Sequence, residues 1–128
     1  MLFRSPIEFL SGQENTALIL RIRGWDSDAA AERAAAALAR AGLAERARQR
    51  AGRLSAGEAQ RLALARALAS ARGLLIVDEP TSRQDETNAR AVAALLAAAA
   101  HTDGQTVICA THDPAVIGQA DYVLALDQ

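Results

Sequence analysis

Apolar and polar positions along the chain predict a first half built only of helices. A short helix is expected over residues 14–22. The alanine-rich stretch 27–41 has acidic residues in its first turn and favours a longer helix, with Gly42 just past its end, where a left-handed residue is preferred. A polar helical segment over 43–50 and a connection over 51–53 complete this half.

The second half alternates between helical and strand patterns. Ser55 and Glu58 have the spacing of a capping box, in which the side chains at the start of a helix bond each other's backbone N–H groups. The continuously apolar run 74–77 is typical of a parallel strand buried on both faces. The further predicted elements are helix 55–72, helix 87–100, strand 106–110, helix 114–119 and strand 122–126. Strands alternating with helices indicate an α/β fold with a parallel sheet.

Composition limits the size and the partners of this domain. The 128 residues fit one domain, and much of the 51% hydrophobic content is alanine, so the core is expected to be thin. A formal net charge of -1 gives no general attraction to nucleic acid or anionic membranes. A group of arginines without interleaved aromatics predicts a solvated helical face and no nucleic-acid partner: Arg46, Arg48, Arg50, Arg53 and Arg61.

Cellular location is constrained by the single cysteine and by the apolar runs. Because Cys109 is the single cysteine, an internal disulfide is excluded, which suits a reducing cytosol. Its place in an apolar stretch favours a small core residue. Residues 1–13 lack the apolar stretch of a signal peptide, and the longest apolar run, 91–100, is too short to span a bilayer. We therefore expect a soluble chain with any membrane role supplied by a partner.

Two acidic residues end the first predicted strand. Asp78 and Glu79 lie at the carboxyl end of that strand, the edge where α/β sheets hold ligands, and adjacent carboxylates there suit a metal ion and a water molecule. His112 follows the next strand, so it would lie on the same rim as Glu79 if the two strands are neighbours. Taken singly, two acids after a strand more often form a solvated turn, and a lone histidine is more often structural. His101, at the end of an alanine helix, fits a partner of the helix dipole.

The octapeptide LSAGEAQR, residues 54–61, has two readings. Helix initiation by Ser55 and Glu58 explains it structurally. An exposed helix N-terminus with Ser55 and Gly57 is also a site where backbone N–H groups favour phosphate. The order of the motifs separates the readings, because LSAGEAQR, LLIVDEP, SRQD and THD follow one another with one helix or strand between them.

In this order and spacing the motifs resemble the C-terminal part of the nucleotide-binding subunit of an ABC transporter, from about Phe9 to Gln128. LSAGEAQR resembles the signature motif, LLIVDEP the Walker B strand, SRQD the D-loop and THD the switch-histidine loop. The stretch FLSGQENTALILRIRG resembles the helical subdomain of transporters of the lipoprotein-releasing and macrolide-exporter type. This resemblance implies an α/β fold with a partial P-loop NTPase core of parallel strands plus an all-helical subdomain, without the half that carries the P-loop (Walker A) and the Q-loop. Residues 1–72 would be the helical subdomain ending in the signature helix, and 73–128 the Walker B half of the core.

The resemblance also implies roles for particular residues. Asp78 would help to hold Mg²⁺, Glu79 would be the general base, and His112 would sense the γ-phosphate, all on ATP bound by their own subunit. The signature residues that would contact the ATP of an opposite subunit in a head-to-tail dimer are Ser55, Gly57, Glu58 and Gln60. Asp85 would link the two sites. A transmembrane permease would be the other partner and would hold the cytoplasmic subunit at the inner face of the membrane.

Three departures from the family pattern change these expectations. All 14 basic residues are arginine, so the lysine of a P-loop is absent, and little or no ATP hydrolysis is expected from this chain alone. Ala56 stands where the family usually has glycine, which adds a methyl group beside the phosphate. Arg83 and Gln84 replace a commonly apolar centre of the D-loop.

Three other functions stay open from the sequence. The chain could be a non-enzymatic partner that lends Ser55 and Gly57 to a complete ATP site, or the truncated product of a decayed gene. It could also be half of a chromosome-maintenance or DNA-repair ATPase, although residues 1–53 show none of the long heptads expected there.

Overall fold

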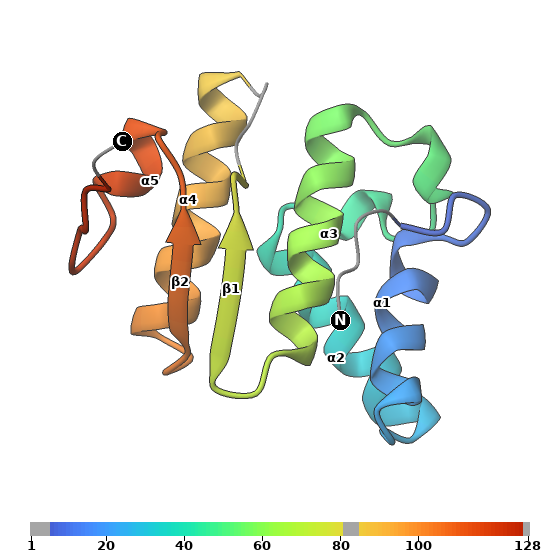
Figure 1. Cartoon of the computed structure of the whole chain (residues 1–128). Coiled ribbons are helices and arrows are strands. Elements are labelled where there is room, and N and C mark those ends of the chain that lie inside the picture. The colour runs from blue at the N-terminus through green and yellow to red at the C-terminus, as the bar shows by residue number, and fades with distance from the viewer. Residues whose placement is uncertain (1–5, 81–84, 127–128) are drawn as a thin grey trace.

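The computed structural model describes residues 6–80 and 85–126. Its first half contains only helices, as predicted. These are α1 (Gly12–Ile22), α2 (Ser27–Arg40), the 3₁₀ turns η1 (Ala44–Arg46) and η2 (Ala51–Arg53), and α3 (Ala56–Ser70). In Figure 1 α1 and α2 pack on one side of α3, and β1 lies on its other side.

Helix α1 begins two residues earlier than the sequence pattern predicts, because of a capping box that the pattern did not reveal. The hydroxyl of Ser11 accepts a hydrogen bond from the Glu14 N–H at 3.0 Å, and the Glu14 carboxylate accepts one from the Ser11 N–H at 2.9 Å. The bond from the Ser11 N–H and, to a smaller extent, the Ser11 hydroxyl lower the pKa of the Glu14 carboxyl group. The start of α1 is therefore satisfied locally.

The prediction of a helical segment over 43–50 is wrong, because the short 3₁₀ turn η1 is the only helical element that forms in this segment. Its carbonyl groups are used elsewhere: the oxygens of Ala47 and Gln49 accept hydrogen bonds from the Gln13 and Gly12 N–H groups at 2.9 and 3.2 Å. Arg50 is extended and pairs with Ser11 in an isolated antiparallel bridge. Tertiary bonds to the start of α1 thus replace the local helix.

The second half forms the predicted parallel sheet. Strand β1 (Leu74–Asp78) pairs in parallel with β2 (Thr106–Ala110), with Leu74 opposite Thr106 and Asp78 opposite Ala110. Helix α4 (Glu86–His101) connects the strands and lies behind them in Figure 1, and the short α5 (Pro114–Ile117) follows β2. The strand–helix–strand unit places the carboxyl ends of both strands at one edge.

The prediction that β1 is buried on both faces is wrong. Leu75 is 7% exposed on the face toward α4, but Leu74, Ile76 and Ile108 are 51%, 71% and 56% exposed on the other face. No segment of the described residues covers that second face. The apolar run shows that both faces of β1 are suited to burial. The layer that would cover the second face has to come from residues other than the strand itself.

The predicted last strand over 122–126 does not form either. Within residues 6–80 and 85–126 the sheet consists of β1 and β2, and neither strand pairs with this segment. Tyr122, Val123, Leu124 and Leu126 are 95%, 64%, 84% and 83% exposed. A strand needs a neighbour for its ladder hydrogen bonds, and the described part of the chain offers none here.

The hydrophobic core is as thin as the composition suggests. Among the described residues, nine of the twenty buried hydrophobic side chains are alanine. Larger side chains fill the centre and join α2, α3, β1 and α4 in one cluster, which includes Leu38, Leu43, Leu62, Leu75, Val92 and Leu96. Since each alanine buries little apolar area, these few leucines and valines carry most of the packing energy.

The C-terminal end of α3 is held by arginines from α1 and α2. Arg23 donates to the Ser70 carbonyl oxygen at 2.9 Å, and Arg33 donates to that of Ala69 at 2.8 Å. The guanidinium of Arg33 also lies 5.2 Å from the centre of the Trp25 ring. A large aromatic residue such as Trp25 is expected to pack in the core, but its side chain is 37% exposed and covers this arginine instead.

Candidate active site at the carboxyl edge of the sheet

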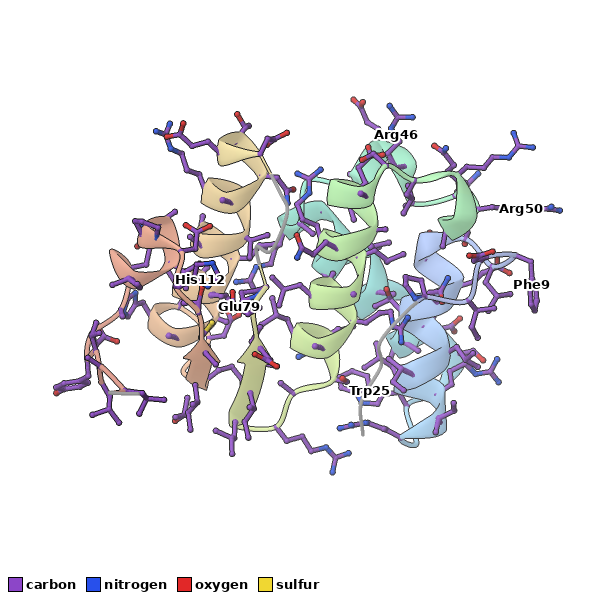
Figure 2. The ribbon with its side chains drawn as sticks, turned by 45° about the horizontal axis from the view of Figure 1, so that its top comes forward. Phe9, Trp25, Arg46, Arg50, Glu79 and His112 are labelled. Atoms are coloured by element: carbon purple, nitrogen blue, oxygen red, sulfur yellow. The ribbon has the colours of Figure 1, made fainter. Side chains whose placement is uncertain are left out.

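The structure brings Glu79 and His112 together at the carboxyl edge of the sheet. Because β1 and β2 are neighbours, the residues that follow them meet, and His112 Nδ1 lies 2.9 Å from Glu79 Oε1. Figure 2 shows the two side chains side by side at the ends of their strands. The His112 side chain is 88% exposed and that of Glu79 36%, so a ligand can reach both. The expected placement on one rim is therefore confirmed.

Glu79 has an unusual backbone conformation. Its φ is +47°, the one positive value found for a non-glycine residue in the described chain. The peptide is held there because its N–H donates a hydrogen bond to the Ala110 carbonyl oxygen at 2.8 Å. A left-handed glutamate is uncommon, and such strain gathers at functional sites. The conformation turns the chain at the strand end and fixes where the carboxylate lies.

Asp78 is the last residue of β1 and is exposed, next to Glu79. Within the described residues, no group of three histidine, cysteine or acidic side chains could hold a metal ion. Mg²⁺ is nonetheless bound in nucleotide sites by only one or two carboxylates, with water and phosphate oxygens as the remaining ligands. The chemistry of Asp78 fits that kind of binding.

The signature octapeptide forms the N-terminus of α3. Ser55 is the N-cap: its hydroxyl accepts a hydrogen bond from the Glu58 N–H at 3.1 Å, and Glu58 Oε1 accepts one from the Ser55 N–H at 3.0 Å. The bond from the Ser55 N–H is the largest cause that lowers the pKa of Glu58, and Arg46 at 3.4 Å adds to the effect. The capping box predicted from the sequence is confirmed.

The capping box leaves two amides available to a ligand. In the described part of the chain, the N–H groups of Ala56 and Gly57 have no hydrogen-bond partner. Ala56 is exposed and Gly57 partly so. Unsatisfied N–H groups at the positive end of a 15-residue helix favour an anion. The structural and the phosphate-binding readings of this motif are therefore compatible.

Gln60 and Asn88 connect α3 to α4, a contact that the sequence did not reveal. Asp85 is the N-cap of α4, and its Oδ1 accepts a hydrogen bond from the Asn88 N–H at 2.7 Å. The Asn88 amide in turn donates to Gln60 Oε1 at 3.2 Å. The spacing of Asp85 and Asn88 is that of an N-cap and its third helical residue, which could have shown this cap. The other D-loop residues, Ser82, Arg83 and Gln84, lie outside the described residues.

The signature helix and the Glu79–His112 pair do not form one site within this chain. In Figure 1 the N-terminus of α3 and the carboxyl ends of the strands lie at the same end of the molecule. Among the described residues, no hydrogen bond or ion pair joins Ser55 or Gly57 to Glu79 or His112. The structure thus presents two separate groups of candidate site residues.

His101 and Cys109 lie outside both groups. His101 is the last residue of α4, as expected for a dipole partner, and its Nε2 lies 3.0 Å from Asp121 Oδ1. Cys109 in β2 is half-buried, and burial raises the pKa of its thiol, with smaller contributions from Glu79 and Asp78. A thiol that stays protonated is a poor nucleophile, in agreement with a packing role.

Comparison with protein families matches residues 3–82 to the family described as ABC transporter. The lipoprotein-releasing system ATP-binding protein LolD of Chromohalobacter salexigens is 41% identical over 126 residues, which cover 98% of this chain and 53% of LolD. The macrolide export ATP-binding/permease protein MacB of Chromobacterium violaceum is 38% identical over 117 residues, 91% of this chain and 18% of MacB. The chain thus spans about half the length of the LolD relatives that it matches.

Solved structures give the same result. The ATP-binding cassette MJ0796, in a dimeric post-hydrolysis state bound to ADP and Pi, superposes with a TM-score of 0.79 at 30% identity. The match covers 93% of this chain and 54% of MJ0796. No helix in the described ranges of this chain is long and apolar enough to cross a bilayer. The family match, the relatives and the cassette fold agree with the motif order, and the chain belongs to the ABC transporter family as an ATP-binding cassette sequence.

Proposed function

We propose that this chain supplies the signature helix and the Walker B edge of an ATP-hydrolysing subunit of a transporter of the lipoprotein-releasing or macrolide-exporting type. Residues 1–72 correspond to the helical subdomain in this proposal, and 73–128 to the Walker B half of the core. The observation that carries it is the 2.9 Å contact between Glu79 and His112, which come from two parallel strands and meet at the ligand-binding edge.

Hydrolysis at this edge follows from the chemistry of the two side chains. Water attacks the γ-phosphorus of ATP, the Glu79 carboxylate accepts the water proton, and ADP leaves as phosphate forms. When the imidazole of His112 is protonated both of its nitrogens donate, so Nδ1 bonds Glu79 while Nε2 is available to a γ-phosphate oxygen. His112 then both orients the base and senses the phosphate.

Asp78 is the residue that would hold Mg²⁺ in this proposal. Its position at the end of β1, directly before Glu79, puts a carboxylate beside the phosphates. The ion supplies positive charge to the phosphate oxygens, and the carboxylate fixes where that charge lies.

The signature helix would act on ATP held by a second cassette. The free N–H groups of Ala56 and Gly57 belong to the helix N-terminus and make no bond to the Glu79–His112 pair, so they suit a phosphate brought by another subunit. Ser55 and Gly57 would contact its γ-phosphate in a head-to-tail dimer, while Glu58 caps the first turn of α3 and Gln60 joins α3 to Asn88 of α4. Asp85 would lie between the two sites.

A transmembrane permease is the second partner in this proposal, because the similar protein MacB is an ATP-binding/permease protein. Such a complex would hold the subunit at the inner face of the membrane. The lipoprotein and macrolide relatives suggest a hydrophobic or amphiphilic cargo.

A graft tests the proposed function. The segment of Chromohalobacter LolD that matches this chain, 53% of that protein, is replaced by the matching 126 residues of this chain, and phosphate release is measured with ATP and Mg²⁺. The LolD residues that remain supply the other half of the cassette. We expect the graft to hydrolyse ATP. A soluble, folded graft without ATP-dependent phosphate release would contradict the proposal.

The 128-residue chain by itself is expected to release no phosphate above the background, because it contains no lysine for a P-loop. The measurement is steady-state phosphate release by the purified chain. Release that a Glu79→Gln substitution abolishes would show that the 128 residues form a complete active site, against our expectation.

Ser55→Asp separates the two roles of the signature serine. Aspartate caps a helix as well as serine does, so the free energy of unfolding of the chain should change by less than about 0.5 kcal/mol, as measured by thermal unfolding. The added negative charge faces the place of the partner's γ-phosphate, so ATP-dependent dimerisation of the graft should weaken by about tenfold or more. Dimerisation is measured by analytical ultracentrifugation with ATP in a Glu79→Gln background, which prevents turnover.

The control for this substitution is Asp26→Ser, which exchanges the same two residue types at the N-cap of α2, where Asp26 bonds the Ala29 N–H at 2.9 Å. It should leave dimerisation unchanged. Equal dimerisation of the Ser55→Asp graft and the parent graft would remove the phosphate role from Ser55.

A further inference from the structure

The face of the sheet opposite α4 carries exposed side chains from both strands, and we call it the bare face. Three cross-strand pairs form it: Leu74 with Thr106, Ile76 with Ile108, and Asp78 with Ala110. Figure 1 looks onto this face, with α4 behind the strands. The three large apolar members are each more than half exposed. Large apolar side chains that gather on one exposed face favour association, because contact removes their area from water.

Opposite charges lie at the two ends of β1. Asp78 is the last residue of the strand, and Arg72 lies two residues before its first residue; both are exposed. In the described part of the chain, no ion pair uses the side chain of either residue. Six positions of extended chain separate them by about 20 Å, so they cannot pair within one chain. Each charge is therefore available to a partner.

This arrangement makes the bare face complementary to itself. A second copy can pack on it face to face, with antiparallel strands and a two-fold axis between Leu74 and Ile76. Arg72 of each copy then lies opposite Asp78 of the other copy, while the apolar side chains meet in the centre. Packed sheets lie about 10 Å apart, a gap that an arginine and an aspartate side chain can span together. The two-fold axis makes every contact twice.

From this complementarity we propose that the chain forms a homodimer through the bare face, without nucleotide. The face is only two strands wide, so the interface is small and the Kd is expected to be on the order of 10–100 µM. This dimer differs from the head-to-tail dimer described above, because it covers Asp78 and uses neither ATP nor Ser55. Its failure would therefore not affect the proposed function.

Sedimentation equilibrium of the full 128-residue chain, without ATP or Mg²⁺, tests the proposal. Between about 2 and 500 µM the average mass should rise from that of a monomer towards that of a dimer. A chain that stays monomeric over this range would overturn the proposal. The bare face would then be left to a different partner, such as the remaining part of a cassette.

Ile76→Glu tests the apolar centre of the interface. Two carboxylates would meet near the two-fold axis, so the Kd of the dimer should rise by about tenfold or more. Ile76 is 71% exposed, so the fold should be retained. The matched control is Ile22→Glu, the same exchange at a residue that is 65% exposed at the end of α1, which α3 separates from the sheet in Figure 1. This control should change the Kd less than about twofold. Equal Kd values for the two variants would contradict the proposal.

An exchange of the two charges tests the antiparallel arrangement, and it also serves should Ile76→Glu fail to fold. Arg72→Asp and Asp78→Arg should each raise the Kd by about tenfold or more, since like charges then face each other across the interface. The double variant restores opposite charges and should have a Kd within about threefold of the parent chain. A double variant that dimerises as weakly as the single variants would rule out this dimer.

Discussion

Replacement of Glu79 by glutamine should lower ATP hydrolysis by the grafted cassette by about 10²–10⁴-fold. The amide oxygen of glutamine can still accept a hydrogen bond from His112, and the backbone bond from residue 79 to Ala110 is unaffected. The fold and the rim should therefore stay intact, while the group that accepts the water proton is lost. Phosphate release at saturating ATP measures the effect, and ATP binding should persist.

Glu86→Gln is the matched control. Glu86 is an exposed residue of the first turn of α4 that pairs with Arg90 one turn later, and among the described residues no hydrogen bond or ion pair joins it to Glu79 or His112. The Glu86→Gln substitution removes the same charge, yet hydrolysis should fall by no more than about twofold. Exposed ion pairs of this kind contribute little to stability, so the fold should be unaffected. If Glu79→Gln and Glu86→Gln reduce hydrolysis equally, Glu79 is not the base.

Leu62→Ala should destabilise the chain by about 2–5 kcal/mol and lower its melting temperature by about 10 °C or more. Leu62 on α3 is 0% exposed and packs in the cluster that joins the helices to the sheet. The surrounding side chains of the cluster are already packed against one another, so they can fill the cavity only in part. The change is a large fraction of the total stability of a small domain.

Thermal and urea unfolding, followed by circular dichroism, measure this loss. Leu124→Ala serves as the control, since Leu124 is 84% exposed and its truncation should change stability by less than about 0.5 kcal/mol. Similar melting temperatures for the two variants would mean that the Leu62 cluster does not hold the helices against the sheet.

The elements with local signals could be predicted from the sequence. The helix over Ser27–Arg40, the capping box of Ser55 and Glu58, and strand Thr106–Ala110 have the predicted character and closely similar bounds. The meeting of Glu79 and His112 also followed from sequence, because parallel neighbouring strands end at one edge and both residues come directly after a strand. Here local propensity and topology determine the result.

The start of α1 was missed because of a local cap, while the other errors involve partners that lie elsewhere in the chain or that the described residues lack. Segment 43–50 has helical composition, but its carbonyl groups bond the start of α1 instead. Segment 122–126 has a strand pattern without a neighbouring strand, and β1 has two apolar faces but only one covering layer. The link from Gln60 to Asn88 is likewise tertiary. Patterns of apolar residues show which surface of a segment can be buried. Only the packed structure shows which other segment, if any, covers that surface.

The arginine contacts at the end of α3 also affect how the signature motif could move. Arg23 and Arg33 fasten Ser70 and Ala69 to α1 and α2, whereas the opposite end of α3 carries the two amides without partners. A helix of 15 residues is about 22 Å long. If α3 follows a tilt of α1 and α2 through these arginine contacts, its far end moves the most. A tilt of about 5° then displaces Ser55 by about 2 Å, which is enough to make or break a hydrogen bond to phosphate.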